Sequence, residues 1–274
     1  MEKAFYNINR FKRLVVFISF MLASTFLSAQ ESSSPTNNQT LLASSPTSAQ
    51  QISFTADDDF LLSADYYLGD VLGAGVLLLH DCAHNNKSYS VLGELLAKQG
   101  IHALALDFRG FGASESNEFS HQAIKKQVKN IVGYQAEVAT LTSYWEKDVL
   151  SAYNYLRQKI GKEQPISIVA SGCAVNEAVL LAQKIRINSF VILSPIMDYM
   201  EKEHYKNLID IPAYFVSSAH HSSSTLTAEE LFSWNGDSRS TSQVFKGVSQ
   251  GHSLLRRNKF LANNIALWLQ RTLN

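Results

Sequence analysis

The chain has 274 residues, which suits one large domain or two small ones. Its 24 basic and 24 acidic residues give a formal charge of zero, so the composition points to neither nucleic acid nor an anionic surface as a partner. The hydrophobic share of 46% is sufficient for a sizeable packed core.

The first 29 residues have the pattern of a signal peptide. A basic start is followed by the apolar run LVVFISFMLASTFL (14–27) and then by small residues that offer a cleavage point near Ala29. This run is shorter than the roughly 20 residues that a membrane-spanning helix needs. We therefore expect export to the periplasm or the exterior, with membrane contact limited to an uncleaved signal segment.

Residues 30–50 are rich in Ser, Thr, Asn and Pro and lack apolar periodicity. This composition predicts a disordered linker, because such a segment cannot bury enough apolar surface to fold. A single folded domain is expected over residues 51–274.

Strands and helices are predicted to alternate along this domain. Residues 52–68 alternate around an acidic turn, which predicts a hairpin. Short runs rich in apolar residues predict buried strands over 75–80, 102–108, 165–170, 189–195, 211–218 and 241–247. Helical spacing predicts helices over 88–99, 143–161, 174–185, 228–234 and 258–273. This order implies a parallel sheet with helices on both faces.

Four segments in this order resemble the α/β-hydrolase fold superfamily. Residues 76–114 look like its oxyanion strand and loop, and they end in the superfamily's Asp-x-Arg-Gly-x-Gly-x-Ser turn at Asp107–Ser114. SIVASGCAVNEAVLLA (167–182) stands where the nucleophile elbow belongs, and SFVILSP (189–195) matches the next strand. SQGHSLL (249–255) stands where the superfamily has its catalytic histidine.

The resemblance covers nearly all of residues 51–274. It implies the α/β-hydrolase fold, an α/β architecture with a twisted, mostly parallel sheet of about eight strands. The segment at about 115–143 is longer than a simple connection needs and predicts a small helical insertion. That insertion is either a lid over the pocket or a surface feature.

The elbow of this superfamily follows Gly-x-Ser-x-Gly, with the nucleophile strained at positive φ between small residues. Gly172 has small residues at both flanks and alanines six and ten positions further on. Cys173, the second candidate, and Ser171, the third, each have a valine at one flank. The favoured frame therefore places Gly172 at a vacant nucleophile position, because glycine has no attacking group.

The resemblance makes His252 the general base. The orienting acid is missing from its usual place, since residues 211–228 contain no Asp or Glu, and Asp198 is the substitute. This implies impaired or absent catalysis, with a pocket kept for a small-molecule ligand or a protein partner. The alternative is an active hydrolase of ester or amide bonds that uses Cys173, or Ser171, with His252 and Asp198.

The resemblance also brings the chain's two cysteines to one place. The oxyanion hole would take backbone N–H groups from Cys173 and Cys82, while Asp81 replaces a glycine usual in the second loop. In an exported chain these cysteines form either a disulfide or two buried thiols. A zinc set of Cys82, His84, Cys173 and His252 has no spacing signature, so neither a metal site nor a cofactor is expected.

Overall fold

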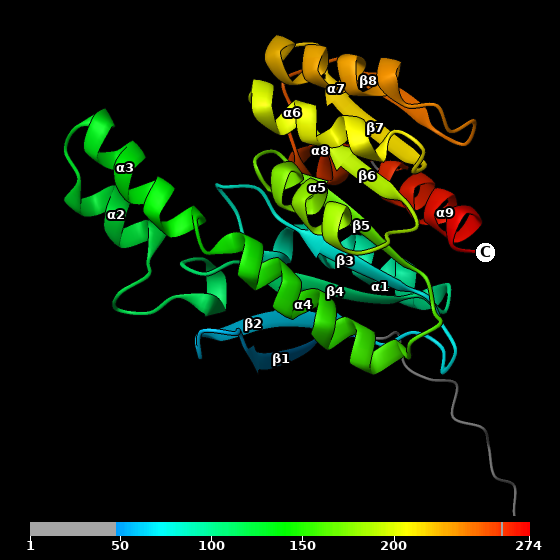
Figure 1. Cartoon of the computed structure of the whole chain (residues 1–274), viewed down its shortest axis with the longest axis horizontal. Coiled ribbons are helices and arrows are strands. Elements are labelled where there is room, and N and C mark those ends of the chain that lie inside the picture. Colours follow the sequence, from blue (N-terminus) through cyan, green and yellow to red (C-terminus); the bar gives the residue numbers. More distant parts are fainter. Residues whose placement is uncertain (1–47, 259) are drawn as a thin grey trace, which may run out of the picture. The chain divides into compact units, whose positions relative to one another are not determined.

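The computed structural model describes residues 48–258 and 260–274. The predicted signal peptide and most of the predicted linker lie outside these residues. The described residues form one sheet of eight strands in the order β1-β2-β4-β3-β5-β6-β7-β8 (Figure 1). Strand β2 is antiparallel to both of its neighbours, and β3 to β8 run parallel. The predicted hairpin and the mostly parallel sheet of about eight strands are confirmed.

The strands follow the predicted runs closely. They are β1 (Gln50–Thr55), β2 (Leu61–Tyr67), β3 (Gly75–Leu79), β4 (His102–Asp107), β5 (Ile166–Ser171), β6 (Phe190–Leu193), β7 (Ala213–Ser218) and β8 (Thr241–Phe245).

The helices include two that the sequence analysis did not predict, α6 and α8. The full set in the described residues is α1 (Ser90–Lys98), α2 (His121–Gln127), α3 (Ile131–Thr142), α4 (Trp145–Ile160), α5 (Ala174–Lys184), α6 (Tyr199–Tyr205), α7 (Ser222–Trp234), α8 (His252–Arg257) and α9 (Leu261–Leu273).

The central strands bury side chains on both faces of the sheet. In β5, Ile168 belongs to the core that contains α4, α5 and α7, and its neighbour Val169 belongs to the core that contains α1, α8 and α9. Successive side chains of a strand point to opposite faces, so a strand between two cores is largely apolar, and its buried serines are hydrogen-bonded, as Ser167 is to Ser189. Figure 1 shows the two helical layers on either side of the sheet.

The segment between β4 and α4 contains the predicted helical insertion, α2 and α3. The two helices contact each other through His121, whose Nε2 lies 2.9 Å from the hydroxyl of Tyr134, and the His121 ring stacks on Phe111. Figure 1 shows both helices projecting beyond the N-terminal end of α4.

The longest described helix, α4, has 16 residues. Across residues 48–258 and 260–274, no helix has both the length and the apolar character that crossing a membrane requires.

Candidate functional site

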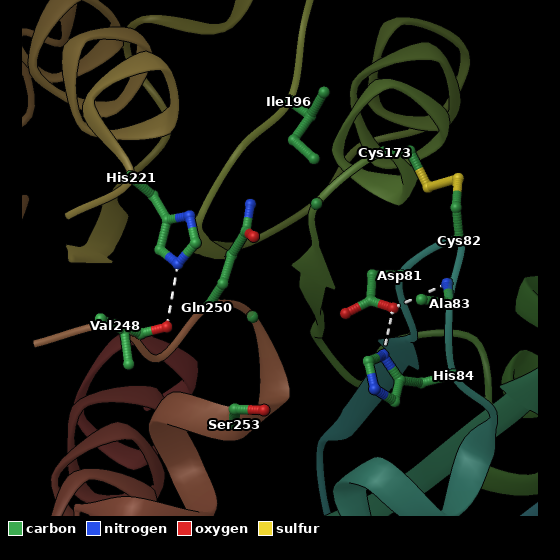
Figure 2. Close-up of a pocket in the computed structure, with 12 residues that line it drawn as sticks. Asp81, Cys82, Ala83, His84, Cys173, Ile196, His221, Val248, Gln250 and Ser253 are labelled. Atoms are coloured by element: carbon green, nitrogen blue, oxygen red, sulfur yellow. Dashed lines mark hydrogen bonds and ion pairs between the residues drawn. A yellow bond between two sulfur atoms is a disulfide. The ribbon is translucent and has the colours of Figure 1, made fainter.

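A cavity of about 330 Å³ opens at the C-terminal edge of the parallel strands. Its walls come from the loops after β3, β5, β6, β7 and β8 (Figure 2). Open α/β sheets bind their ligands at this edge, because the loops that follow the strands converge there. The lining residues are Asp81, Cys82, Ala83, His84, Gly172, Cys173, Ile196, His221, Val248, Gln250, Gly251 and Ser253.

The turn after β4 supports the wall formed by the β3–α1 loop. Both carboxylate oxygens of Asp107 accept backbone N–H groups, one from Asn86 at 2.8 Å and one from Ala113 at 2.9 Å. Gly112 has φ +54°, and a Cβ there would lie 2.4 Å or less from the Asp107 carboxylate oxygens. The Asp-x-Arg-Gly-x-Gly-x-Ser pattern thus ties the β4 turn to the end of the β3–α1 loop.

His80 begins the β3–α1 loop and is almost fully buried. Its Nδ1 lies 2.7 Å from the carbonyl oxygen of Asp81, and its Nε2 lies 3.2 Å from the backbone N–H of Phe108. A carbonyl only accepts and an amide only donates, so His80 is neutral with its proton on Nδ1. Burial lowers the pKa of His80 to about 4, which agrees with this state.

The turn between β5 and α5 has Gly172 at its tip. Gly172 has φ +57°, whereas Cys173 has φ −68° and begins the helix. Ser171 is the last residue of β5 and is not among the described non-glycine residues with positive φ. Of the three residues that compete for the nucleophile position, Gly172 alone has the left-handed conformation expected there.

Ser171 has its hydroxyl in the core instead of the cavity. Its side chain is fully buried, and its Oγ lies 2.5 Å from the hydroxyl of Tyr89. The Tyr89 hydroxyl donates to the carbonyl oxygen of Leu79 at 3.0 Å, so it accepts the proton of Ser171.

Cys82 and Cys173 form a disulfide, with 6.0 Å between their Cα atoms. Figure 2 shows the bond joining the β3–α1 loop to the start of α5. The disulfide alternative is therefore confirmed, and the alternative of two buried thiols is wrong. Because zinc binds cysteine as a thiolate, the two bonded sulfurs cannot serve in the zinc site considered in the sequence analysis.

The carboxylate beside His252 belongs to Asp81. The Nδ1 of His252 lies 3.9 Å from Oδ2 of Asp81, and the Nδ1 of His84 lies 2.5 Å from Oδ1. The centroids of the two imidazole rings are 3.8 Å apart. Burial raises the pKa of Asp81, but the nearby imidazoles of His252 and His84 and the N–H of Ala83 outweigh it and lower the pKa to about 2.

Asp198, the predicted orienting acid, is exposed and lies at the start of α6. Its Oδ1 accepts the backbone N–H of Glu201 at 2.9 Å, while the Glu201 side chain accepts the N–H of Asp198 at 2.7 Å. This reciprocal pair is a capping box, which stabilises the first turn of a helix. Asp198 therefore caps α6, and the carboxylate within 4 Å of the Nδ1 of His252 belongs to Asp81 instead.

Asp81, which the sequence analysis placed in the oxyanion loop, and His84, which it weighed as a zinc ligand, both line the cavity. His221 also lines it, and sequence reasoning did not assign it to the site. The Nε2 of His221 donates to the carbonyl oxygen of Val248 at 2.9 Å.

The fold resembles that of several solved hydrolases. Esterase Pf2001 of Pyrococcus furiosus matches with a TM-score of 0.61 at 15% identity, over 83% of this chain and 94% of that chain. Dienelactone hydrolase from Anabaena variabilis matches with a TM-score of 0.65 at 11% identity, over 84% and 100%. A cold-adapted esterase from an Arctic intertidal metagenomic library matches with a TM-score of 0.55 at 18% identity, over 82% and 94%. At these identities the similarity concerns the fold alone.

No curated protein sequence matches the chain. The sequence pattern of one family, serine aminopeptidase S33, matches residues 72–253, well over half of the chain. The matched segment runs from just before β3 to the first turn of α8, where His252 lies, and so includes the whole parallel part of the sheet. The chain belongs to the serine aminopeptidase S33 family and has the α/β-hydrolase fold.

Proposed function

We propose that this chain is an exported α/β-hydrolase-fold protein that has lost nucleophilic catalysis and binds a small molecule in the cavity. The observation that carries the proposal is Gly172 at the tip of the β5–α5 turn, at φ +57°. An acyl-enzyme needs an oxygen or sulfur at this position, and glycine supplies neither.

The state of the two neighbouring residues supports the same proposal. Cys173 has its sulfur in the bond to Cys82, so it is not available as a thiolate. Ser171 is buried and its proton goes to Tyr89. The alternative, an active ester or amide hydrolase, requires one of these two side chains to leave its present partner.

The cavity itself supports a role in binding. Its volume of about 330 Å³ lies at the lower end of the range typical for small-molecule sites. Its walls combine apolar Ile196 and Val248 with the polar side chains of Asp81 and Gln250. Such a lining can enclose a small ligand and orient it by a few hydrogen bonds.

The disulfide supports the proposal of export. Disulfides persist in oxidising compartments and are reduced in the cytosol by thioredoxin and glutathione. The pattern of a signal peptide in the first 29 residues agrees with this location, although these residues lie outside the described ones.

The purified, oxidised protein is expected to show no turnover of p-nitrophenyl acetate or of aminoacyl p-nitroanilides above the rate of the His252→Ala variant. The same protein is expected to remain unlabelled by a fluorophosphonate probe, because no hydroxyl lies at the turn. Peptide mapping by mass spectrometry checks the second result. Turnover that His252→Ala abolishes, or a stoichiometric label on Ser171, contradicts the proposal.

Placing a hydroxyl at the turn is not expected to restore activity. In Gly172→Ser the new Cβ would lie 3.0 Å from the Cβ of Asp81, and the backbone would keep its left-handed conformation. We expect a loss of about 1–3 kcal/mol in the free energy of unfolding, together with no esterase activity. Urea unfolding and the p-nitrophenyl acetate assay measure the two effects.

Gly161→Ser is a control for a serine at positive φ without crowding. Gly161 has φ +87° and ψ 166°, a region nearly restricted to glycine, and a Cβ there would meet nothing within 4 Å. Its loss of stability therefore reports backbone strain alone. Esterase activity in Gly172→Ser would show that the turn can accept a nucleophile.

A further inference from the structure

Three side chains with metal-binding atoms converge at the mouth of the cavity. Asp81 and His84 come from the loop after β3, and His252 comes from the start of α8, far along the chain. One ligand atom from each lies within 4.8 Å of the other two. Figure 2 shows Asp81 and His84 directed toward each other at the edge of the cavity.

The donor types and their spacing suit a transition-metal ion. Two imidazole nitrogens and one carboxylate are a common ligand set of zinc sites with an open fourth position. Ligand atoms about 2.0–2.1 Å from a tetrahedral zinc ion stand about 3.3 Å from one another. The Nδ1 of His84 lies 2.5 Å from Oδ1 of Asp81, and the Nδ1 of His252 lies 3.9 Å from the other oxygen, Oδ2. Small side-chain rotations would bring one carboxylate oxygen and both nitrogens to the spacing that zinc requires.

His252 supplies an independent indication. Its Nδ1 is shielded from solvent and has no hydrogen-bond partner among the described residues. Buried polar atoms in folded proteins are nearly always satisfied, so an orphaned ring nitrogen directed at a carboxylate points to a missing partner. A cation bound to Asp81 would satisfy this nitrogen.

The backbone on both sides of the cluster is held in place. The disulfide follows Asp81 directly, and Oδ1 of Asp81 also accepts the N–H of Ala83 at 2.9 Å. Gly251 precedes His252 with φ +52°, and a Cβ there would lie 2.8 Å from Oδ2 of Asp81. The N–H of Gly251 donates to Ser194 at 3.0 Å. The glycine lets the His252 segment approach Asp81, and these contacts preorganise the ligands.

We propose that Asp81, His84 and His252 bind one divalent transition-metal ion of the zinc class at the edge of the cavity. An open coordination position on this ion would take water or a donor atom of a small ligand. The set differs from the one weighed on sequence, because the cysteines are paired and Asp81 supplies the third ligand. The site does not depend on the loss of hydrolase activity.

Zinc binding to the oxidised protein without a histidine tag tests the site. The protein is first stripped with a chelator, and zinc is then titrated by isothermal calorimetry and against a chromophoric chelator. We expect one ion per chain, with the affinity lowered at least tenfold in each of His84→Gln, Asp81→Asn and His252→Gln. Cobalt in place of zinc is expected to give the visible absorption of a four- or five-coordinate site.

His220→Gln is the control, because His220 is exposed and lies outside the cluster. It is expected to bind zinc as the unchanged protein does. The side chain of His84 is 41% exposed, so His84→Gln removes a ligand without disturbing the core. Unchanged affinity in His84→Gln, or equal losses in it and in His220→Gln, would overturn the proposal. Since the readout is binding, its failure says nothing about hydrolysis, and hydrolase activity would leave this result unaffected.

Discussion

Replacing Cys82 and Cys173 together by alanine is expected to lower the free energy of unfolding by about 4 kcal/mol. The disulfide joins residues separated by 91 positions in the sequence. In the chain-entropy account, a cross-link stabilises a protein by restricting its unfolded chain, and the effect grows with the size of the closed loop. A loop of this size therefore puts the bond near the upper end of the usual range.

Urea unfolding of the oxidised protein, the reduced protein and the double variant checks this expectation. The chain has two cysteines in all, so a reductant acts on one bond. The reduced protein and the double variant should therefore agree. A loss of less than about 1 kcal/mol would mean that the unfolded chain is already compact between these residues, or that the bond strains the native state.

Arg109→Met is expected to lower the free energy of unfolding by about 3–5 kcal/mol. The Arg109 side chain is 2% exposed and makes ion pairs with Asp58 at 2.7 Å and with Asp148 at 2.9 Å. Its guanidinium also lies 4.3 Å from the ring centroid of Phe60. Methionine keeps much of the volume and removes the charge. Asp148, which is fully buried, then loses its counter-ion, and an unpaired buried charge is strongly destabilising.

The loss of stability in Arg109→Met, measured as the free energy of unfolding, should depend on pH. Burial raises the pKa of Asp148 to about 6, although Arg109 opposes this shift. Without Arg109 the pKa rises further. A carboxyl group whose pKa is higher in the folded state than in the unfolded state destabilises the fold increasingly as pH rises through that interval. The difference in free energy of unfolding between the unchanged protein and Arg109→Met is therefore expected to be smaller at about pH 5 than at about pH 7.5.

Two further variants test this explanation. Adding Asp148→Asn to Arg109→Met should recover part of the stability at neutral pH, because the amide carries no charge to desolvate. Arg239→Met is the surface control, since Arg239 is 55% exposed in its pair with Asp237, and its loss is expected to stay below about 1 kcal/mol. If the loss in free energy of unfolding in Arg109→Met is independent of pH, the packing of Arg109 against the aromatic rings contributes more to stability than its neutralisation of Asp148.

Sequence patterns predicted most of the sheet because its central strands lie between two cores. An unbroken apolar run such as GVLLL in β3 predicts a strand that is buried on both faces of a sheet, and all five residues of β3 are buried. Two short helices were not predicted, for different reasons. The capping box of Asp198 and Glu201 was visible in the sequence, but Asp198 was assigned a catalytic role. Helix α8 has six residues, which is too short for a helical period to appear.

At the site, too, one contact was predicted from the sequence and another was not. The meeting of Cys82 with Cys173 was predicted from the resemblance, which puts both residues at the oxyanion hole. The structure agrees, because they follow the neighbouring parallel strands β3 and β5, whose ends lie at one edge of the sheet. The carboxylate that lies beside His252 was not predictable. Asp81 reaches His252 because Gly251 allows the chain to come within contact distance, and such proximity depends on the path of a loop that no periodicity describes.

The disulfide also constrains how the chain matures. With two cysteines there is one intramolecular pairing, so oxidation during folding cannot trap a wrong isomer of the monomer. Cys82 leaves the ribosome 91 residues ahead of its partner and must remain reduced until that partner appears. Because β3 and β5 are adjacent in the sheet, the bond can form only when the ends of these two strands lie close together.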